Sequence, residues 1–206
     1  GISKLNIKND KFNHYKKDKK NINSLSDNRT RGLLEARNGN LWVNTVKSID
    51  LFDPINNSFK HYNYPKGNGK ESHLNNGAIL FNDSKDRIWL GNEQGLAFFN
   101  TKDQTFIQYI YNEKPAITSS IRSICEDYFG NLWIGTYTGL YILNHEKQTL
   151  NNFMHDENDP KSLSQNSIYE IKQDSKGDIW IGTWSGGINY YDRSFDNFKQ
   201  LRAGTN

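Results

Sequence analysis

The sequence predicts an all-β chain: a β-propeller segment of four complete four-stranded blades plus an N-terminal half blade. Three observations carry this prediction. Four tryptophans recur at near-constant spacing, the apolar residues around them alternate as in strands, and no run shows the 3.6-residue period of a helix. A chain of 206 residues can bury roughly 70% of the surface that it exposes when unfolded, so it is long enough to build a core.

The recurrent tryptophans are separated by 47, 44 and 47 residues: Trp42, Trp89, Trp133 and Trp180. Each follows Leu or Ile directly and stands three residues after Gly or Asp. An aspartate lies six residues before the last three of them, namely Asp83, Asp127 and Asp174, whereas Ala36 holds that place in the first repeat. We expect each aspartate to accept hydrogen bonds from the amides of the turn that follows it.

Four short strands make up each repeat. Nine residues before each tryptophan stands an apolar residue of the first strand, and the tryptophan itself marks the second. A glycine turn precedes the third strand, as in Leu140–Leu143, and a polar turn precedes the fourth, as at Leu150 and Phe153. Repeats of four strands and about 40–45 residues are typical of propeller blades. We therefore expect the tryptophans to fill the wedge between neighbouring twisted sheets.

The repeat spacing divides the chain into a half blade at residues 1–28 and blades at about 29–76, 77–120, 121–167 and 168–206. Residues 1–15 match the second half of a repeat, so the two inner strands of that blade are expected outside the chain. We interpret the chain as a segment of a longer propeller. Because the edges of open sheets invite strand pairing, we expect association in isolation.

Composition excludes several classes of protein. The 5 Trp, 11 Tyr and 11 Phe argue against disorder, although only 34% of residues are hydrophobic. The net charge of +3 is too small and too dispersed to indicate nucleic-acid binding. No run of 18 apolar residues predicts a transmembrane helix, and the first residues have no signal-peptide character.

No catalytic or metal motif stands out, and no cofactor is expected. The histidines lack metal-ligand spacing, and the single cysteine, Cys125, has no recognisable base beside it and is interpreted as a buried small residue. The segment Lys16–Lys20 holds four lysines in five residues. Phosphate or heparin binding is conceivable there, but the run is more typical of a solvated loop.

By analogy with other proteins of this fold, ligands of propellers tend to bind around the central channel. Eleven residues before the tryptophans stand Arg31, Ala78, Arg122 and Tyr169, which are expected around one mouth of the channel. Four residues after two of the tryptophans stand Tyr137 and Trp184, whose rings suit the apolar face of a sugar; alternatively they only cap the neighbouring blade. Arginine suits a carboxylate or sulfate. With Asn76 added, the candidate ligand-binding residues are Arg31, Asn76, Arg122, Tyr137, Tyr169 and Trp184.

The repeat pattern Asp-x-x-Gly-Asn/Asp-Leu/Ile-Trp-Ile-Gly-Thr-x-x-Gly-Leu, with a preceding Ser-Leu-Ser-x-Asn linker, resembles the two-component regulator propeller repeat. It is best matched at residues 127–143 and 174–191. The whole chain is similar to the periplasmic sensor region of hybrid two-component systems of gut Bacteroidetes. The first blade departs from the pattern, with Ala36 in place of Asp and Asn44 in place of Gly.

The resemblance implies a periplasmic sensor that responds to oligosaccharides and controls genes for polysaccharide utilisation. It also implies an immunoglobulin-like domain, a membrane span, a histidine kinase, a receiver and a DNA-binding domain outside this chain, and a homodimer in the full-length protein. The segment itself is expected to be non-catalytic and to contact no nucleic acid, and to meet the membrane only through the missing parts.

Two other functions stay open at this stage. One is a propeller scaffold for protein–protein interaction without a small ligand. The other is a propeller enzyme, such as a lyase or glycosidase, which requires paired carboxylates or a metal cluster at the channel. Glu35 and Glu170 are the only candidates for such a pair, and they fall at different offsets in their repeats.

Overall fold

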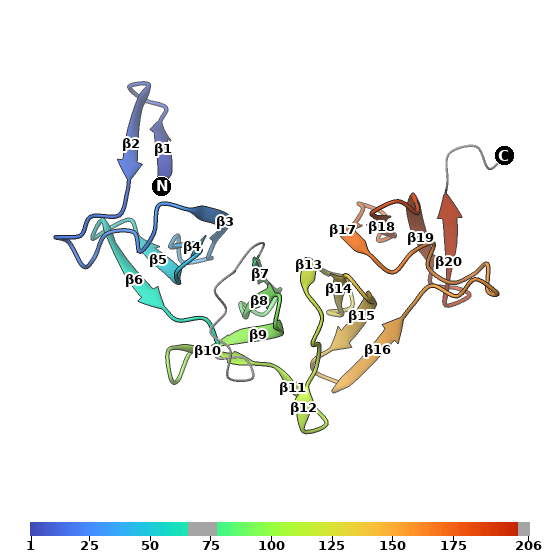
Figure 1. Ribbon diagram of the computed structural model, residues 1–206. Helices are drawn as coiled ribbons and strands as arrows, with labels where there is room; N and C mark the ends of the chain where they lie inside the picture. Colours follow the sequence, from blue (N-terminus) through green and yellow to red (C-terminus); the bar gives the residue numbers. More distant parts are fainter. Residues whose placement is uncertain (66–77, 202–206) are drawn as a thin grey trace. The chain divides into compact units, whose positions relative to one another are not determined.

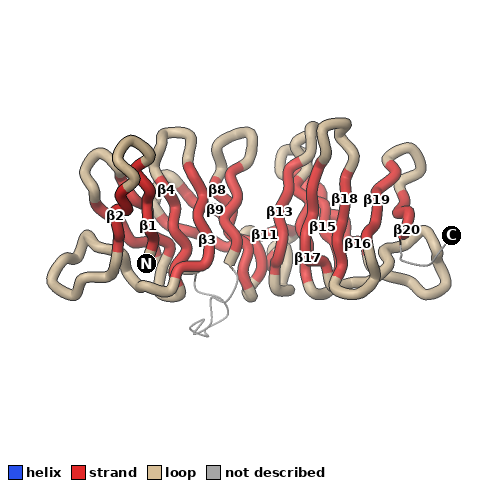
Figure 2. The backbone as a smooth tube through the Cα atoms, turned by 90° about the horizontal axis from the view of Figure 1, so that it is seen from above, coloured by secondary structure: helices blue, strands red, loops and turns tan. Residues whose placement is uncertain are grey.

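The computed structural model describes residues 1–65 and 78–201. All regular structure in these ranges is β-strand (Figure 2). Accordingly, the described part holds no helix that is long and apolar enough to cross a membrane. The fold class predicted from the sequence is confirmed: four antiparallel four-stranded sheets follow one two-stranded hairpin (Figure 1).

The chain divides into two compact units. The first comprises Gly1–Leu90 and Ala97–Gln108, and the second comprises Gly91–Leu96 and Tyr109–Asn206. The turn of one hairpin is therefore grouped with the second unit, although its sheet belongs mainly to the first.

The first unit begins with the hairpin of β1 (Ile2–Asn6) and β2 (Lys11–Tyr15), in which Ile2 lies opposite Tyr15. A sheet in the order β3-β4-β5-β6 follows, with β3 at Thr30–Glu35, β4 at Leu41–Thr45, β5 at Ile49–Asp53 and β6 at Ser58–Tyr62. The next sheet has the order β10-β9-β8-β7, with β7 at Ile79–Asn82, β8 at Ile88–Asn92, β9 at Gly95–Asn100 and β10 at Thr105–Gln108.

The second unit holds two complete sheets. The strands of the first are β13 (Ile121–Glu126), β14 (Leu132–Thr136), β15 (Gly139–Asn144) and β16 (Thr149–Phe153). Those of the other are β17 (Ile168–Gln173), β18 (Ile179–Thr183), β19 (Ile188–Asp192) and β20 (Asn197–Leu201). In both sheets, each strand pairs with the next one in sequence, as expected of a propeller blade.

A short hairpin of β11 (Ile110–Tyr111) and β12 (Lys114–Pro115) precedes these sheets, and the sequence analysis did not predict it. Its two turn residues, Asn112 and Glu113, both have positive φ, at 49° and 63°. Two positive φ values in a two-residue loop are the mark of a type I′ turn. Glu is an unusual residue there, which is why the turn is hard to see in the sequence.

The tryptophans fill the space between sheets where a following sheet lies in the same unit. Trp42 is 4% exposed and its ring packs against Phe99 and Phe106 of the next sheet, at centroid distances of 5.1 and 5.7 Å. Trp133 is 1% exposed and contacts Tyr191 of the next sheet at 4.8 Å. Trp180 belongs to the last sheet and is only half-buried, with Tyr190 of its own sheet at 5.3 Å.

The repeated aspartates bond both the turn and the indole. In the third repeat, Asp127 Oδ1 accepts hydrogen bonds from the amides of Phe129 and Asn131, both at 2.9 Å, as predicted. The other oxygen, Oδ2, accepts a bond from Trp133 Nε1 at 2.9 Å, which the sequence analysis did not foresee. Equivalent indole bonds join Trp89 to Asp83 at 2.8 Å and Trp180 to Asp174 at 2.9 Å. The six-residue spacing thus fixes the tryptophan ring and the preceding turn together.

The glycine two residues after the tryptophan gives the next sheet room to approach. A Cβ on Gly135 would stand 2.5 Å from Ile168 Cγ2 on β17. In the first repeat, where Asn44 replaces this glycine, the side chain is used as a tie instead. Its Nδ2 donates to the carbonyl of Ala78 at 2.5 Å, and its Oδ1 accepts from the Tyr64 hydroxyl. Asn44, which replaces the glycine of the repeat pattern, therefore stabilises the first unit through these two hydrogen bonds.

Candidate functional site

Four of the six predicted ligand-binding residues come together in the second unit. Arg122 lies on β13, Tyr169 on β17, and Tyr137 and Trp184 lie in the turns that follow β14 and β18. Their side chains form one continuous column in the order Tyr137, Arg122, Tyr169, Trp184. We call these four residues the aromatic–arginine column.

Two β-bulges place the inner-strand members of the column. The pairing of β13 with β14 shifts register between Ile121 and Ser123, at Arg122, and the pairing of β17 with β18 shifts between Ile168 and Glu170, at Tyr169. A bulge leaves one residue out of the ladder and redirects its side chain. The residue eleven positions before each tryptophan is thus released from the sheet.

Arg122 is held between two rings. Its guanidinium carbon lies 3.7 Å from the centroid of the Tyr137 ring and 3.8 Å from that of Tyr169. Its Nη2 donates to both tyrosine hydroxyls, at 3.0 Å for Tyr169, and Nη1 donates to Ser167 Oγ at 3.4 Å. Cation–π contacts on both faces fix the orientation of the positive charge.

The far end of the column is an exposed aromatic surface. The Trp184 ring stacks on Tyr169, with centroids 5.0 Å apart and planes inclined by 25°. Trp184 is 67% exposed, Tyr137 51% and Tyr169 40%. One face of the Trp184 indole is covered by Tyr169, so the high exposure belongs to its other face and edges. Exposed large rings on a rigid support suit stacking on a flat apolar ligand face.

The alternative interpretation, in which Tyr137 and Trp184 only cap the neighbouring blade, does not describe these contacts. Each ring packs on the inner-strand residue of its own sheet, Tyr137 on Arg122 and Trp184 on Tyr169. Within the column, the contact that joins the two sheets is the one between Arg122 and Tyr169.

Of the other two predicted residues, one lies in the first unit and the other outside the described residues. Arg31 lies on β3 in the first unit and is exposed; it too stands at a register shift, between Thr30 and Gly32. Asn76 lies outside the described residues. The sequence analysis identified the residue positions but missed the bulges, because nothing in the residue types alone marks them.

No group of three or more His, Cys, Asp and Glu residues within residues 1–65 and 78–201 is arranged to hold a metal ion. Glu35 lies on β3 in the first unit and Glu170 on β17 in the second, and both are exposed. Burial raises the pKa of the Cys125 thiol, which lowers its reactivity at neutral pH.

Comparison with known families identifies the repeats. The family model described as two component regulator propeller matches residues 116–138 and 162–185. Each matched segment contains a bulged inner strand with residues of the linker before it, and the complete Trp strand that follows. These two segments are similar to the two-component regulator propeller repeat. No curated protein matches it.

Solved structures of extracellular domains of two-component systems share the fold. The extracellular domain of the hybrid two-component system BT4673 from B. thetaiotaomicron is 22% identical, with a TM-score of 0.72, over 98% of this chain and 25% of that one. The extracellular domain of BT3049 from the same organism is 25% identical, with a TM-score of 0.51, over 92% of this chain and 30% of that one. The chain therefore spans about a quarter of the length of these propeller regions.

A propeller enzyme also has the same fold. Virginiamycin B lyase from Staphylococcus aureus is 14% identical, with a TM-score of 0.62, over 88% of this chain and 58% of that one. At this identity the similarity concerns the fold alone, so it carries no catalytic residues over to this chain.

Proposed function

We propose that this chain is a non-catalytic, ligand-sensing propeller segment of the periplasmic region of a hybrid two-component histidine kinase. Its ligand is an oligosaccharide, and its output is control of genes for polysaccharide utilisation. The observation that carries the proposal is the aromatic–arginine column: an exposed indole and two tyrosines around a fixed arginine, on repeats of the two-component regulator family.

Each member of the column has a distinct role in this proposal. Trp184 offers its uncovered face to the apolar side of a sugar ring. Tyr137 and Tyr169 offer hydroxyls to sugar hydroxyls, and Arg122 holds the two rings in place and supplies a positive charge. Because the rings are already ordered by stacking, binding costs little side-chain entropy.

The proposed sensor works by preferring one arrangement of its parts. A ligand that binds one arrangement of the propellers, or of a homodimer of the full-length protein, more tightly than another shifts the equilibrium towards it. The membrane span and the kinase lie outside this chain in the proposal, and this segment meets neither nucleic acid nor lipid.

Calorimetry with a panel of defined oligosaccharides tests the proposal. At least one is expected to bind, and Trp184→Ala is expected to weaken it by about fivefold or more, because one stacking platform is worth about 1–3 kcal/mol and each 1.4 kcal/mol is about tenfold. The matched control is Phe195→Ala: Phe195 is 73% exposed but lies in the turn between β19 and β20, outside the column.

The control variant is expected to bind as the unchanged chain does. Equal affinity of the Trp184 and Phe195 variants for every bound oligosaccharide would exclude the column as the contact. If the chain bound no oligosaccharide of the panel but formed a saturable complex with a protein partner, this result would support a scaffold function instead of ligand sensing.

A further inference from the structure

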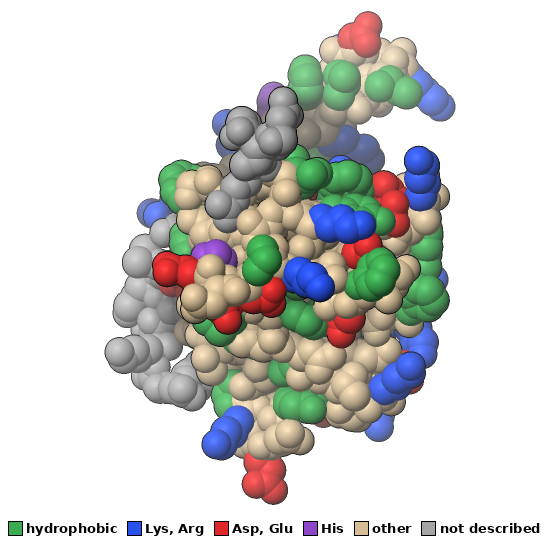
Figure 3. Space-filling view, turned by 90° about the vertical axis from the view of Figure 1, so that its right-hand side faces the viewer, with side chains coloured by type: hydrophobic (Ala, Val, Ile, Leu, Met, Phe, Trp, Pro, Cys, Tyr) green, Lys and Arg blue, Asp and Glu red, His purple; other side chains and the backbone are tan. Residues whose placement is uncertain are grey.

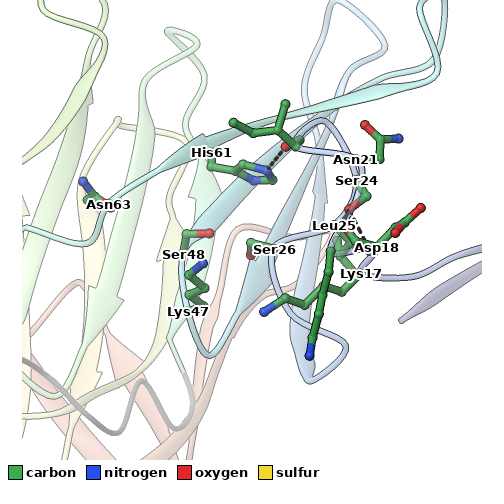
Figure 4. A pocket seen from close by; sticks show the side chains of 12 residues that line it. Lys17, Asp18, Asn21, Ser24, Leu25, Ser26, Lys47, Ser48, His61 and Asn63 are labelled. Atoms are coloured by element: carbon green, nitrogen blue, oxygen red, sulfur yellow. Dashed lines mark hydrogen bonds between the residues drawn. The ribbon is translucent and has the colours of Figure 1, made fainter.

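The lysine run at residues 16–20 lies beside a pocket in the first unit. The loop of residues 17–28, which joins β2 to β3, stands over the turn between β4 and β5, and together with β6 they enclose about 300 Å³. Figure 4 shows Lys47 and Ser48 on one side of this pocket, Lys17 and Asp18 on the other, and Ser26 between them. Lys19 and His61 also line it.

The loop over the pocket is held by its own hydrogen bonds. Asn28 Oδ1 accepts from the amide of Lys17 at 2.8 Å, and Ser24 Oγ accepts from the amide of Asp18 at 2.8 Å. The amide of Phe59 on β6 donates to the carbonyl of Asn23 at 2.8 Å. Lys17 and Lys19 therefore project from an ordered frame and not from a free tail.

The second unit contains the same frame, in the loop of residues 155–166. There the amide of His155 donates to Asn166 Oδ1 at 2.6 Å, and the amide of Asp156 donates to Ser162 Oγ at 2.9 Å. The amide of Phe198 on β20 donates to the carbonyl of Lys161 at 2.9 Å. The chain thus provides an internal comparison, since the two loops share their backbone bonds.

Loops 17–28 and 155–166 differ in the bonds that they make with the turn after the Trp strand of their own sheet. In the second copy, Gln165 Nε2 donates to Ser185 Oγ at 2.7 Å, and Gln165 Oε1 accepts from the Ser185 amide at 3.1 Å. In the first copy, Asp27 takes the place of Gln165 and bonds Arg29 at 3.0 Å. Among the residues that the structure describes, Lys47 in the facing turn has no carboxylate partner in an ion pair.

The two copies also differ in charge. The first places Lys17, Lys19 and Lys47 on the pocket, whereas the second has His155, Glu157 and Ser185 at the corresponding places. Lysine clusters of this kind attract anions, provided that local carboxylates do not neutralise them.

Two carboxylates near the pocket are already occupied by the protein. Asp50, fully buried, accepts bonds from the Ser26 amide at 2.8 Å, from Ser48 Oγ at 2.6 Å and from His61 Nδ1 at 2.9 Å. Asp18, on the lining, accepts from the amide of Lys20 at 2.9 Å. The lining therefore holds three lysines and one carboxylate, that of Asp18, while Asp27, which pairs with Arg29, also interacts electrostatically with Lys17.

We propose that this pocket is a binding site for an oxyanion, that is, a sulfate, phosphate or carboxylate group. The ammonium groups of Lys17, Lys19 and Lys47 supply the charge, and the bonded frame of loop 17–28 fixes the backbone that carries Lys17 and Lys19. The corresponding loop of the second unit, with the same frame and acidic side chains, is predicted not to bind such a group.

The test is a calorimetric titration of the chain with sodium sulfate, sodium phosphate and sodium acetate at constant ionic strength, against sodium chloride. Saturable binding of at least one oxyanion is expected. The triple variant K17Q/K19Q/K47Q is expected to weaken it by at least tenfold. The control K8Q/K11Q/K172Q changes the net charge equally at exposed lysines outside the pocket, and is expected to bind within twofold of the unchanged chain.

Glucose 6-sulfate and glucose, as a further pair of probes, distinguish a free ion from a group carried on a sugar. Tighter binding of the sulfated sugar than of inorganic sulfate assigns the site to a sugar-borne group, and equal binding assigns it to the ion itself. The proposal is overturned if no oxyanion saturates, if the pocket variant binds unchanged, or if the control variant loses affinity equally. Circular dichroism of both variants shows whether the fold is kept.

Discussion

Trp133 donates a hydrogen bond from its indole Nε1 to Oδ2 of Asp127, at 2.9 Å, and the two residues are 1% and 4% exposed. The same carboxylate binds Arg193 from the next sheet, with Nη2 at 3.1 Å. A single aspartate therefore fixes the turn before the tryptophan, the tryptophan itself and an arginine of the following blade.

Replacing this aspartate is expected to lower stability strongly. In Asp127→Ala, the buried indole N–H and Arg193 lose their acceptor, and the free energy of unfolding is expected to fall by about 2–4 kcal/mol. Asp174→Ala is the comparison, because the Trp180 that it bonds is only half-buried, and we expect a smaller loss. Urea unfolding followed by tryptophan fluorescence measures both. Losses of equal size would show that the indole bond is not the source of the effect.

The same carboxylates predict acid sensitivity. Burial by itself raises the pKa of Asp127, but the bonds from Asn131, Trp133 and Arg193 outweigh it, so the net pKa lies below its ordinary value. Because the pKa of Asp127 is lower in the folded chain than in the unfolded chain, its ionisation stabilises the fold at pH values above the unfolded-state pKa of about 3.9. This stabilisation is lost as the pH falls through the folded-state pKa. Stability is therefore expected to be flat from pH 7 to about 5 and to fall below about 4.

Unfolding midpoints in urea at several pH values test this dependence. The variant Asp127→Asn cannot release the same proton, so its stability is expected to change less between about pH 5 and 3 than that of the unchanged chain. A steeper acid loss in the variant would contradict the assignment.

Two equivalent glycines are predicted to respond differently to the same change. Gly135→Ala puts a Cβ 2.5 Å from Ile168 Cγ2, whereas Gly182→Ala meets nothing closer than 3.8 Å. Overpacking of this kind costs about 1–3 kcal/mol, so Gly135→Ala is expected to lower the unfolding midpoint and Gly182→Ala to leave it nearly unchanged. If both variants were equally stable, the close approach of β17 to β14 would be refuted.

The linkers before the bulged strands β3 and β17 are each held by one buried side chain. In the first unit, Asp50 accepts from the Ser26 amide at 2.8 Å, and in the second, Asn189 accepts from the Ser164 amide at 2.8 Å. Asp50→Asn keeps an acceptor oxygen and is expected to cost less than Asp50→Ala, by about 1–2 kcal/mol. Thermal unfolding of the two variants measures the difference; a more stable alanine variant would contradict the role given to this side chain.

The fold was predictable because its signal is periodic. The tryptophan spacing and the glycine turns specify four sheets, as observed, and the two leading strands are present as a hairpin. Within residues 1–65 and 78–201, neither the hairpin of β11 and β12 nor the tie made by Asn44 has a counterpart in another repeat, so no comparison between repeats reveals them.

The sequence predicted that four candidate residues lie together, but not the order in which their side chains stack. Counting from the tryptophans found Arg122, Tyr137, Tyr169 and Trp184, because equivalent positions in a propeller have equivalent surroundings. The stacking order depends on bulges at Arg122 and Tyr169, which are properties of strand register. The charged pocket at Lys47 was missed because the loop and turn that form it are distant in sequence.

Figure 3 shows one face of the molecule, on which charged side chains of both signs are interspersed with hydrophobic ones. This agrees with the small net charge of +3 and offers no broad single-sign surface on that face. Recognition of an oligosaccharide by this chain is therefore expected to depend on local contacts such as the column.

A crystal structure of the chain with an oligosaccharide identified by calorimetry tests the central claim most directly. The account predicts a sugar ring stacked on the uncovered face of Trp184, with a sugar hydroxyl within hydrogen-bond distance of Tyr137 or Tyr169 and with Arg122 still between the two tyrosines. A sugar bound elsewhere, with the four side chains untouched, would contradict it.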